Sequence, residues 1–144
     1  MEAQEKGIIA KYSEDSFTVV LKLVDEFPDE AVRSKFRWLT VVSWKYDGSE
    51  NNGMPLEEVN LGMIRLEEAI EDSIETEGCC RHAYSRTGNN LKEFVYYIES
   101  RDEFLEVFNK ALESHPRYPI EINFYEDQQW EDFQRILGMI KREQ

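Results

Sequence analysis

The residues best suited to catalysis lie together in one short segment around His82. A histidine that can accept a proton is followed by Tyr84, by the hydroxyl of Ser85 and by Arg86, which could bind an anion. Nucleophilic catalysis requires a serine or cysteine beside a histidine that a third group orients. The sequence has no Gly-x-Ser-x-Gly elbow and no glycine-rich phosphate loop. We therefore treat this segment as the pocket of an alternative, hydrolase-like function, and assign no catalytic residue.

Soft metal ligands are few. They are Cys79, Cys80, His82 and His115. A structural zinc site needs four ligands, usually with two to four residues between paired cysteines. Adjacent cysteines project to opposite faces of a strand, so we expect no zinc site.

The segment that begins at Asp47 partly imitates a calcium-binding loop. Its oxygen-bearing side chains fall at positions 1, 3, 5 and 12 of such a loop: Asp47, Ser49, Asn51 and Glu58. However, Asn52 replaces the glycine that permits the sharp turn, and Pro55 occupies position 9. A solvated turn is the better interpretation, and we expect neither a metal nor a cofactor.

A strongly acidic helix is the most distinctive element of the chain. Apolar residues recur at steps of three and four and predict a helix from about Leu56 to Glu77. Its acidic side chains greatly outnumber its one basic residue, Arg65. We select five of them as a candidate docking face for a basic protein partner: Glu67, Glu68, Glu71, Asp72 and Glu75. A solvated outer face without a partner is the alternative interpretation.

The elements that position these residues can be read from apolar periodicity. Alternation predicts strands over 17–24, 36–46 and 120–124, and a hairpin of 80–86 with 91–99 around Thr87-Gly88-Asn89-Asn90. A capping box at Ser100 and Glu103 begins a second helix, and Asp127 can cap a third. From residue 36 onward the order is strand, helix, strand, strand, helix, strand. This order predicts an α+β, ferredoxin-like βαββαβ sandwich with an extra N-terminal strand and C-terminal helix.

Length and charge limit the possible functions. The chain has 144 residues, with 17 Lys and Arg against 30 Asp and Glu, a net charge of −13. We expect one domain over residues 1–144, with residues 1–11 frayed. Such a charge disfavours binding to nucleic acids and to anionic membranes. The start of the chain lacks the features of a signal peptide, so we expect a cytoplasmic protein. The oligomeric state is open.

The order of several motifs resembles a known family. An aromatic strand, Trp38 to Tyr46, precedes the turn Asn52-Gly53-Met54-Pro55 and the acidic helix. Thr87-Gly88 then precedes the strand Phe94-Val95-Tyr96-Tyr97, and Tyr118-x-Ile120, Glu126-Asp127 and Trp130 close the pattern. This succession, over roughly residues 17–137, resembles the bacterial domain of unknown function family 695. The resemblance implies no activity, cofactor or catalytic residue. The resemblance also implies relatives that are joined to a domain like an acidic regulator that inhibits a ribonuclease, and this association favours a protein-binding regulator.

The leading hypothesis is therefore a cytoplasmic protein-interaction or regulatory module with an acidic helix face, and not an enzyme. The alternative is a small hydrolase-like enzyme that uses His82 with its polar neighbours.

Overall fold

The computed structural model describes residues 7–24, 26–75, 78 and 80–142. The strands are β1 (Gly7–Glu14), β2 (Phe17–Val24), β3 (Trp38–Lys45), β4 (Cys80–Gly88), β5 (Leu91–Ile98) and β6 (Ile120–Glu126). The helices are α1 (Glu30–Lys35), α2 (Glu57–Ile70), the π-helical segment η1 (Glu71–Glu75), α3 (Arg101–Ala111) and α4 (Glu131–Arg142). None of the helices in these ranges is long and apolar enough to span a membrane.

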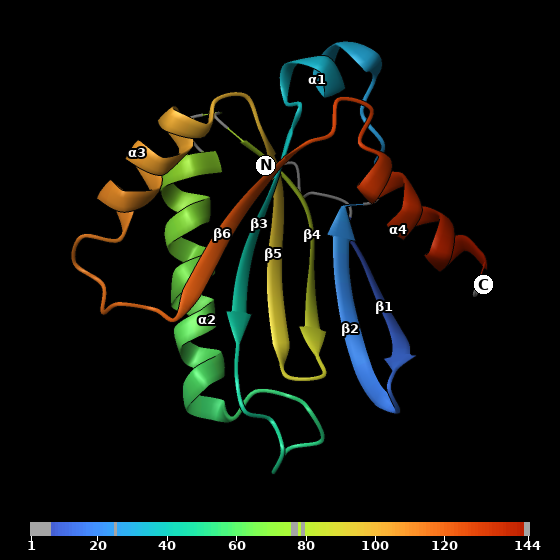
Figure 1. Cartoon of the computed structure of the whole chain (residues 1–144), viewed down its shortest axis with the longest axis vertical. Coiled ribbons are helices and arrows are strands. Elements are labelled where there is room, and N and C mark those ends of the chain that lie inside the picture. The colour runs from blue at the N-terminus through green and yellow to red at the C-terminus, as the bar shows by residue number, and fades with distance from the viewer. Residues whose placement is uncertain (1–6, 25, 76–77, 79, 143–144) are drawn as a thin grey trace, which may run out of the picture.

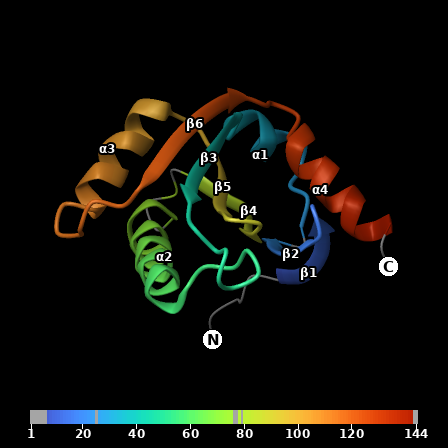
Figure 2. The same cartoon turned by 60° about the horizontal axis from the view of Figure 1, so that its bottom comes forward.

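The strands form one antiparallel sheet in the order β1-β2-β4-β5-β3-β6 (Figure 1). The mixed α+β class is confirmed, and the elements from β3 onward follow the predicted order. Helices α2 and α3 lie side by side, well separated from α4 (Figures 1 and 2). The sheet therefore has two covered faces, which we call the α2–α3 face and the α4 face.

Strand β5 is buried on both faces. Its side chains alternate between the two cores, with Phe94, Tyr96 and Ile98 packed under α2 and α3. Val95 and Tyr97 belong to the core under α4. On β3, Val42 and Trp44 are buried against Met63, Leu66 and Ile70 of α2, which confirms the predicted strand parity. Trp38 belongs to the same face but is only partly buried, and the Arg101 guanidinium lies over its ring, 4.3 Å from the ring centre.

A tight turn joins β4 to β5 and holds the loop that follows β3. Asn89 and Asn90 both have positive φ, which is typical of a two-residue hairpin turn. The Asn90 N–H donates to the Gly53 carbonyl at 2.9 Å, and its side chain accepts from the Gly48 N–H at 2.8 Å. A Cβ atom on Gly48 would lie 2.6 Å from the Gly53 carbonyl carbon, so the chain can pass here only without a side chain. The Asn52-Gly53 turn seen in the sequence is therefore held against the β4–β5 hairpin.

Helix α4 is fixed to the sheet through Trp130 and Asp127. The Trp130 ring stacks on Tyr97 with centroids 4.0 Å apart, and its Nε1–H donates to the Phe36 carbonyl at 2.9 Å. Asp127 accepts the Tyr97 hydroxyl at 2.8 Å and the Glu131 N–H at 2.8 Å. Asp127 thus caps the helix as predicted, and one carboxylate joins the helix start to the sheet.

The structure differs from the sequence analysis at four points in the first 36 residues. Residues 7–11 belong to β1 and are not frayed, because alternate residues from Ile8 pack against the α4-face core. The extra N-terminal strand is thus a β1–β2 hairpin. Helix α1 was not predicted, since its six residues bury no side chain and show no apolar stripe. Phe36 caps α1 and packs in the α4-face core, so it does not begin β3.

We predict opposite effects of alanine at two glycines. Gly53 has φ +82°, and an added Cβ would lie 2.8 Å from Phe17 and 3.1 Å from the Asn89 nitrogen. Gly53→Ala should lower the free energy of unfolding by about 1–3 kcal/mol through backbone strain. Gly138, in α4, has open space around it, so Gly138→Ala should stabilise by roughly 0.5–1 kcal/mol. Urea unfolding of both variants is the measurement, and equal effects would contradict the docked-loop interpretation.

Candidate functional site

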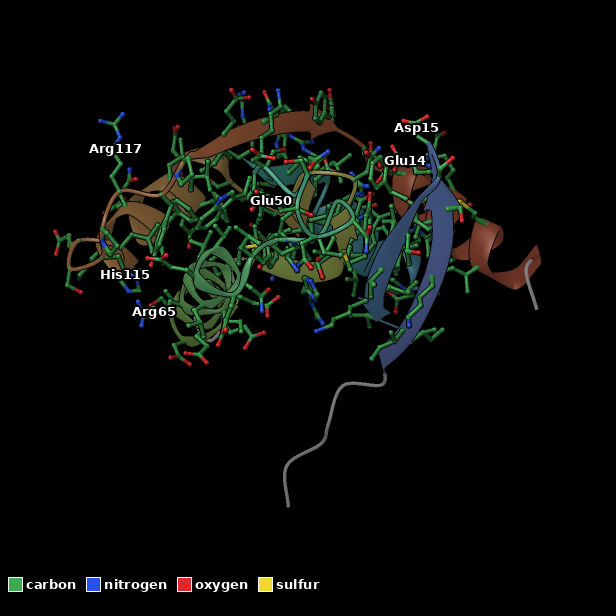
Figure 3. The ribbon with its side chains drawn as sticks, turned by 90° about the horizontal axis from the view of Figure 1, so that it is seen from below. Glu14, Asp15, Glu50, Arg65, His115 and Arg117 are labelled. Atoms are coloured by element: carbon green, nitrogen blue, oxygen red, sulfur yellow. The ribbon has the colours of Figure 1, made fainter. Side chains whose placement is uncertain are left out.

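A cavity of about 310 Å³ lies between α2 and the β1–β2 hairpin. Figure 3 shows these two walls standing on either side of the middle strands. The cavity is lined by Gly7, Ile8, Ile9, Lys22, Leu23, Val24, Glu67, Glu71, His82 and Ser85. It therefore combines two acids of the predicted docking face with two residues of the predicted alternative pocket. From the sequence, these two groups were assigned to unrelated sites.

A β-bulge brings His82 and Ser85 to the same face. Residues three apart in a regular strand point to opposite faces. In β4, however, the pairing with β5 shifts between His82 and Tyr84, so that Ala83 is the additional residue. His82 then lies opposite Tyr96 and Ser85 opposite Phe94, both on the α2–α3 face.

The same bulge places Tyr84 and Arg86 on the α4 face. The Tyr84 hydroxyl donates to Asp132 Oδ2 at 2.7 Å. Burial raises the pKa of this hydroxyl, and the hydrogen bond to Asp132 raises it further. The Arg86 Nη2 contacts Glu14 Oε2 at 2.8 Å and donates to the Gly88 carbonyl at 3.2 Å. These two residues connect β4 to α4 and to β1. The sheet separates them from His82 and Ser85, so the four do not form one pocket.

The His82 imidazole is neutral at pH 7. Burial lowers its pKa to about 4, the nearby Lys92 charge acts in the same direction, and a hydrogen bond with the Tyr84 backbone opposes them. Its ring is tilted against Tyr96 with centroids 5.2 Å apart, and its buried Nε2 has no hydrogen-bond partner among the described residues. A neutral imidazole of this kind can accept a proton or a hydrogen bond.

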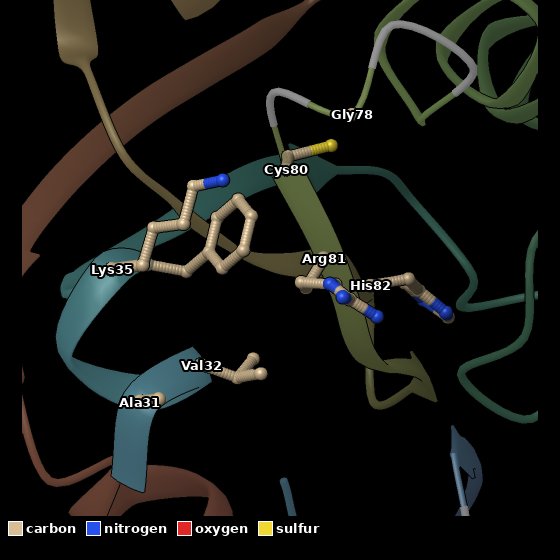
Figure 4. A pocket seen from close by; sticks show the side chains of 8 residues that line it. Ala31, Val32, Lys35, Gly78, Cys80, Arg81 and His82 are labelled. Atoms are coloured by element: carbon tan, nitrogen blue, oxygen red, sulfur yellow. The ribbon is translucent and has the colours of Figure 1, made fainter. Parts of the chain in front are cut away.

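His82 also contributes to two further cavities beside β4. One, of about 470 Å³, lies between α1 and β4, with Ala31, Val32 and Lys35 on one side and Arg81 and His82 on the other (Figure 4). The other, of about 350 Å³, extends from Val24 to Trp130 and Phe133 under the start of α4. His82 therefore borders three cavities.

Charges of both signs surround the cavity between α2 and the β1–β2 hairpin. Burial lowers the pKa of Lys92, and the charge of the half-buried Glu67 opposes this shift in part. The Lys92 Nζ donates to Thr87 Oγ1 at 2.7 Å. Lys22 lies on the opposite wall, on β2. Sequence reasoning missed Lys22 and Ile9 as parts of this site, and Lys92 as a charge beside it. The alternation of apolar and polar residues along β2 was a signal for Lys22 alone.

The other acids selected from the sequence lie elsewhere on the helix. Glu68 and Asp72 are exposed and do not line the cavity. The side chain of Glu75 lies outside the described side chains. Leu61 is 47% exposed and Ile64 is 41% exposed, so apolar surface accompanies the charge on α2.

The candidate metal ligands are not assembled in the described part of the chain, where no group of three or more His, Cys, Asp or Glu side chains could hold an ion. Cys80 is buried in the core under α2 and α3, whereas His115 Nδ1 bonds the Tyr118 hydroxyl at 2.8 Å. Cys79 lies outside the described residues. In the loop after β3, Asp47 Oδ1 accepts the Ser49 N–H at 3.0 Å, and its hydrogen bonds with Ser49 lower its pKa.

The chain belongs to a family of unknown function (DUF695), whose model matches residues 13–137. The matched range contains β2 to α3, β6 and most of α4, and therefore most of the cavity wall. No curated protein and no solved structure shows a significant match to the chain.

We predict that His82 makes stability depend on pH. The folded pKa of about 4 lies below the roughly 6.5 of an unfolded histidine. The unfolded state therefore binds more protons between these values, and stability is lost as pH falls through this window. Between pH 7 and pH 5, protonation linked to His82 should lower the free energy of unfolding by about 2 kcal/mol.

Urea unfolding at both pH values is the measurement, with His82→Gln as the test variant and His115→Gln as the matched control. His82→Gln should remove this component and His115→Gln should retain it. The same pH dependence in both variants would show that His82 is not the group responsible.

Proposed function

We propose that this domain is a protein-interaction module that binds a basic segment of a partner in the cavity between α2 and the β1–β2 hairpin. The observation that carries the proposal is the set of residues that line this cavity. Glu67 and Glu71 border the cavity together with Ile8 and with Ile9, whose side chain is 69% exposed. Lysine and arginine side chains have apolar stems and charged heads, so they match a surface that places the exposed Ile9 beside carboxylates.

Electrostatics favour the same class of partner. The net charge of −13 attracts cationic proteins from a distance, although salt screens this attraction. On α2, the exposed Leu61 and Ile64 lie between the acids at 57–58 and those at 67–68. Apolar side chains next to charges of one sign are typical of interaction surfaces.

The two walls would also orient the bound segment. Carboxylates lie on the wall formed by α2 and η1, and the Lys22 ammonium lies on the β2 wall. A cationic head is therefore attracted to α2 and repelled from β2. An apolar side chain of the same segment would then contact Ile9.

We predict that the cavity acids matter more than the outer acids of the same helix. The probe is a fluorescein-labelled 12-residue peptide of alternating lysine and leucine, with a glutamate–leucine peptide as the charge control. The double variant Glu67→Gln with Glu71→Gln should weaken binding about tenfold, since each lost charge pair contributes roughly 0.5–1 kcal/mol at such a site. Fluorescence polarisation at low and moderate salt is the measurement.

The matched control is Glu68→Gln with Asp72→Asn, which removes the same charge from the same helix outside the cavity. It should change the affinity by no more than about twofold, a long-range effect that salt screens. Equal weakening by both pairs would mean that only net charge attracts the peptide. Circular dichroism checks that each variant is folded, because Glu67 also stabilises the Lys92 charge.

A second candidate function is hydrolysis of a small ester or amide. The observation in its favour is that His82 and Ser85 line the same cavity and that the imidazole is in its basic form at pH 7. In this reaction His82 would accept the Ser85 proton while the hydroxyl oxygen attacks the substrate carbonyl. The imidazolium would return that proton to the alcohol or amine as it leaves, and water would then release the acyl group from Ser85.

For this alternative we predict that activity requires both cavity residues and not Tyr84. Hydrolysis of p-nitrophenyl acetate should fall to background in His82→Ala and in Ser85→Ala, and Tyr84→Phe should retain it because its hydroxyl contacts Asp132 on the other face. Release of p-nitrophenol, followed by absorbance, is the readout. Activity that survives both alanine variants would exclude this site as its source.

A further inference from the structure

Strand β6 is an exposed edge of the sheet. It pairs only with β3 in the described structure, in an unbroken register from Trp38 with Glu126 to Trp44 with Ile120. Edge strands are often protected from pairing by charged side chains, especially lysine, by proline or by a bulge. The segment Ile120–Glu126 has no lysine, proline or bulge, and its charged residues are Glu121 and Glu126. The opposite edge, β1, carries Lys11 in its middle.

The sequence of β6 is complementary to itself when reversed. Asn123 is the central residue of the strand, so a two-fold axis through it would pair β6 with β6 of a second copy over its full length. In this antiparallel register Ile122 lies opposite Phe124, and Glu121 lies opposite Tyr125. Neither glutamate of β6 faces another charge, and like charges directly opposite are what would destabilise such a pair.

The two sides of β6 suit this register. Ile120, Ile122 and Phe124 are only partly buried at the border of the core under α2 and α3. A second copy would extend that core across the axis. On the opposite side Tyr125 is 53% exposed, and its hydroxyl could donate to Glu121 of the second copy.

Charges at the strand ends are complementary as well. The two-fold axis brings the start of one β6 beside the end of the other. Arg117, three residues before the strand, is exposed and extends away from the fold (Figure 3). It would lie at the end of the interface where the second copy contributes Glu126, which is also exposed.

We propose that the chain forms a symmetric homodimer in which β6 strands of two copies pair antiparallel about Asn123, giving a continuous sheet. The interface is isologous, so the same residues act twice. Because each copy carries −13, added salt strengthens the dimer by screening the repulsion between the copies. The cavity between α2 and the β1–β2 hairpin lies near the opposite edge of the sheet and is not covered.

The first experiment measures the dimer dissociation constant of the full chain by sedimentation velocity. Asn123→Lys places two ammonium groups opposite each other at the axis and should raise the dissociation constant at least about tenfold. Ser13→Lys makes the same charge change at the β1 edge, where the residue is exposed, and should leave the constant unchanged. A chain that stays monomeric up to about 1 mM, or equal effects of the two lysines, would overturn the proposal.

The second experiment tests the register directly. Cα atoms directly opposite in an antiparallel pair are about 4.5–5.5 Å apart, which a disulfide can bridge. Under mild oxidation Asn123→Cys should therefore give a covalent dimer on non-reducing gels, and Ser13→Cys should remain at the level of the parent chain, which has Cys79 and Cys80. A dimer that forms without the Asn123→Cys crosslink would place the interface elsewhere and overturn the register.

Discussion

Burial of β5 on both faces is the constraint on which the rest of the fold depends. Five consecutive residues, Phe94 to Ile98, are each at most 1% exposed. A strand of this kind needs a layer on either side of the sheet. Helices α2 and α3 supply one layer, and α4 supplies the other through Trp130 and Asp127. The tyrosines of β5 make this possible, because Tyr97 gives α4 an aromatic surface and a hydroxyl to bond.

Incomplete cover on one face creates the candidate site. The α2–α3 core contains residues of β3, β4, β5 and β6 and none of β1 or β2 among the described residues. The β1–β2 hairpin packs on the other core through Leu21 and Leu23. Its α2-facing side is therefore left beside α2 without a helix above it, and the cavity with Glu67 and His82 lies there. The cavity is a consequence of a six-stranded sheet that has too few helices on this side.

The bulge at Ala83 decides which polar residues meet. It turns His82 and Ser85 toward α2, and it turns Tyr84 and Arg86 toward α4 and β1. One pair borders a cavity and the other pair joins elements of the fold. Burial, together with the nearby Lys92 charge, keeps the His82 imidazole neutral. The site therefore offers an uncharged hydrogen-bond acceptor in the same cavity as the Glu67 and Glu71 carboxylates.

The sequence alone determined the elements whose signals are local. The period of two in 17–24 and the paired asparagines between β4 and β5 were sufficient for their strands, and so were the apolar stripe of α2 and the caps at Ser100 and Asp127. Helix α1 and strand β1 were missed because short or edge elements are stabilised by contacts with distant segments and not by their own pattern. The site was decided only by tertiary structure. Glu67 and His82 are brought to one cavity by the path of α2 across the sheet, and Ser85 joins them because of one additional residue in β4, which no periodicity in the sequence reveals.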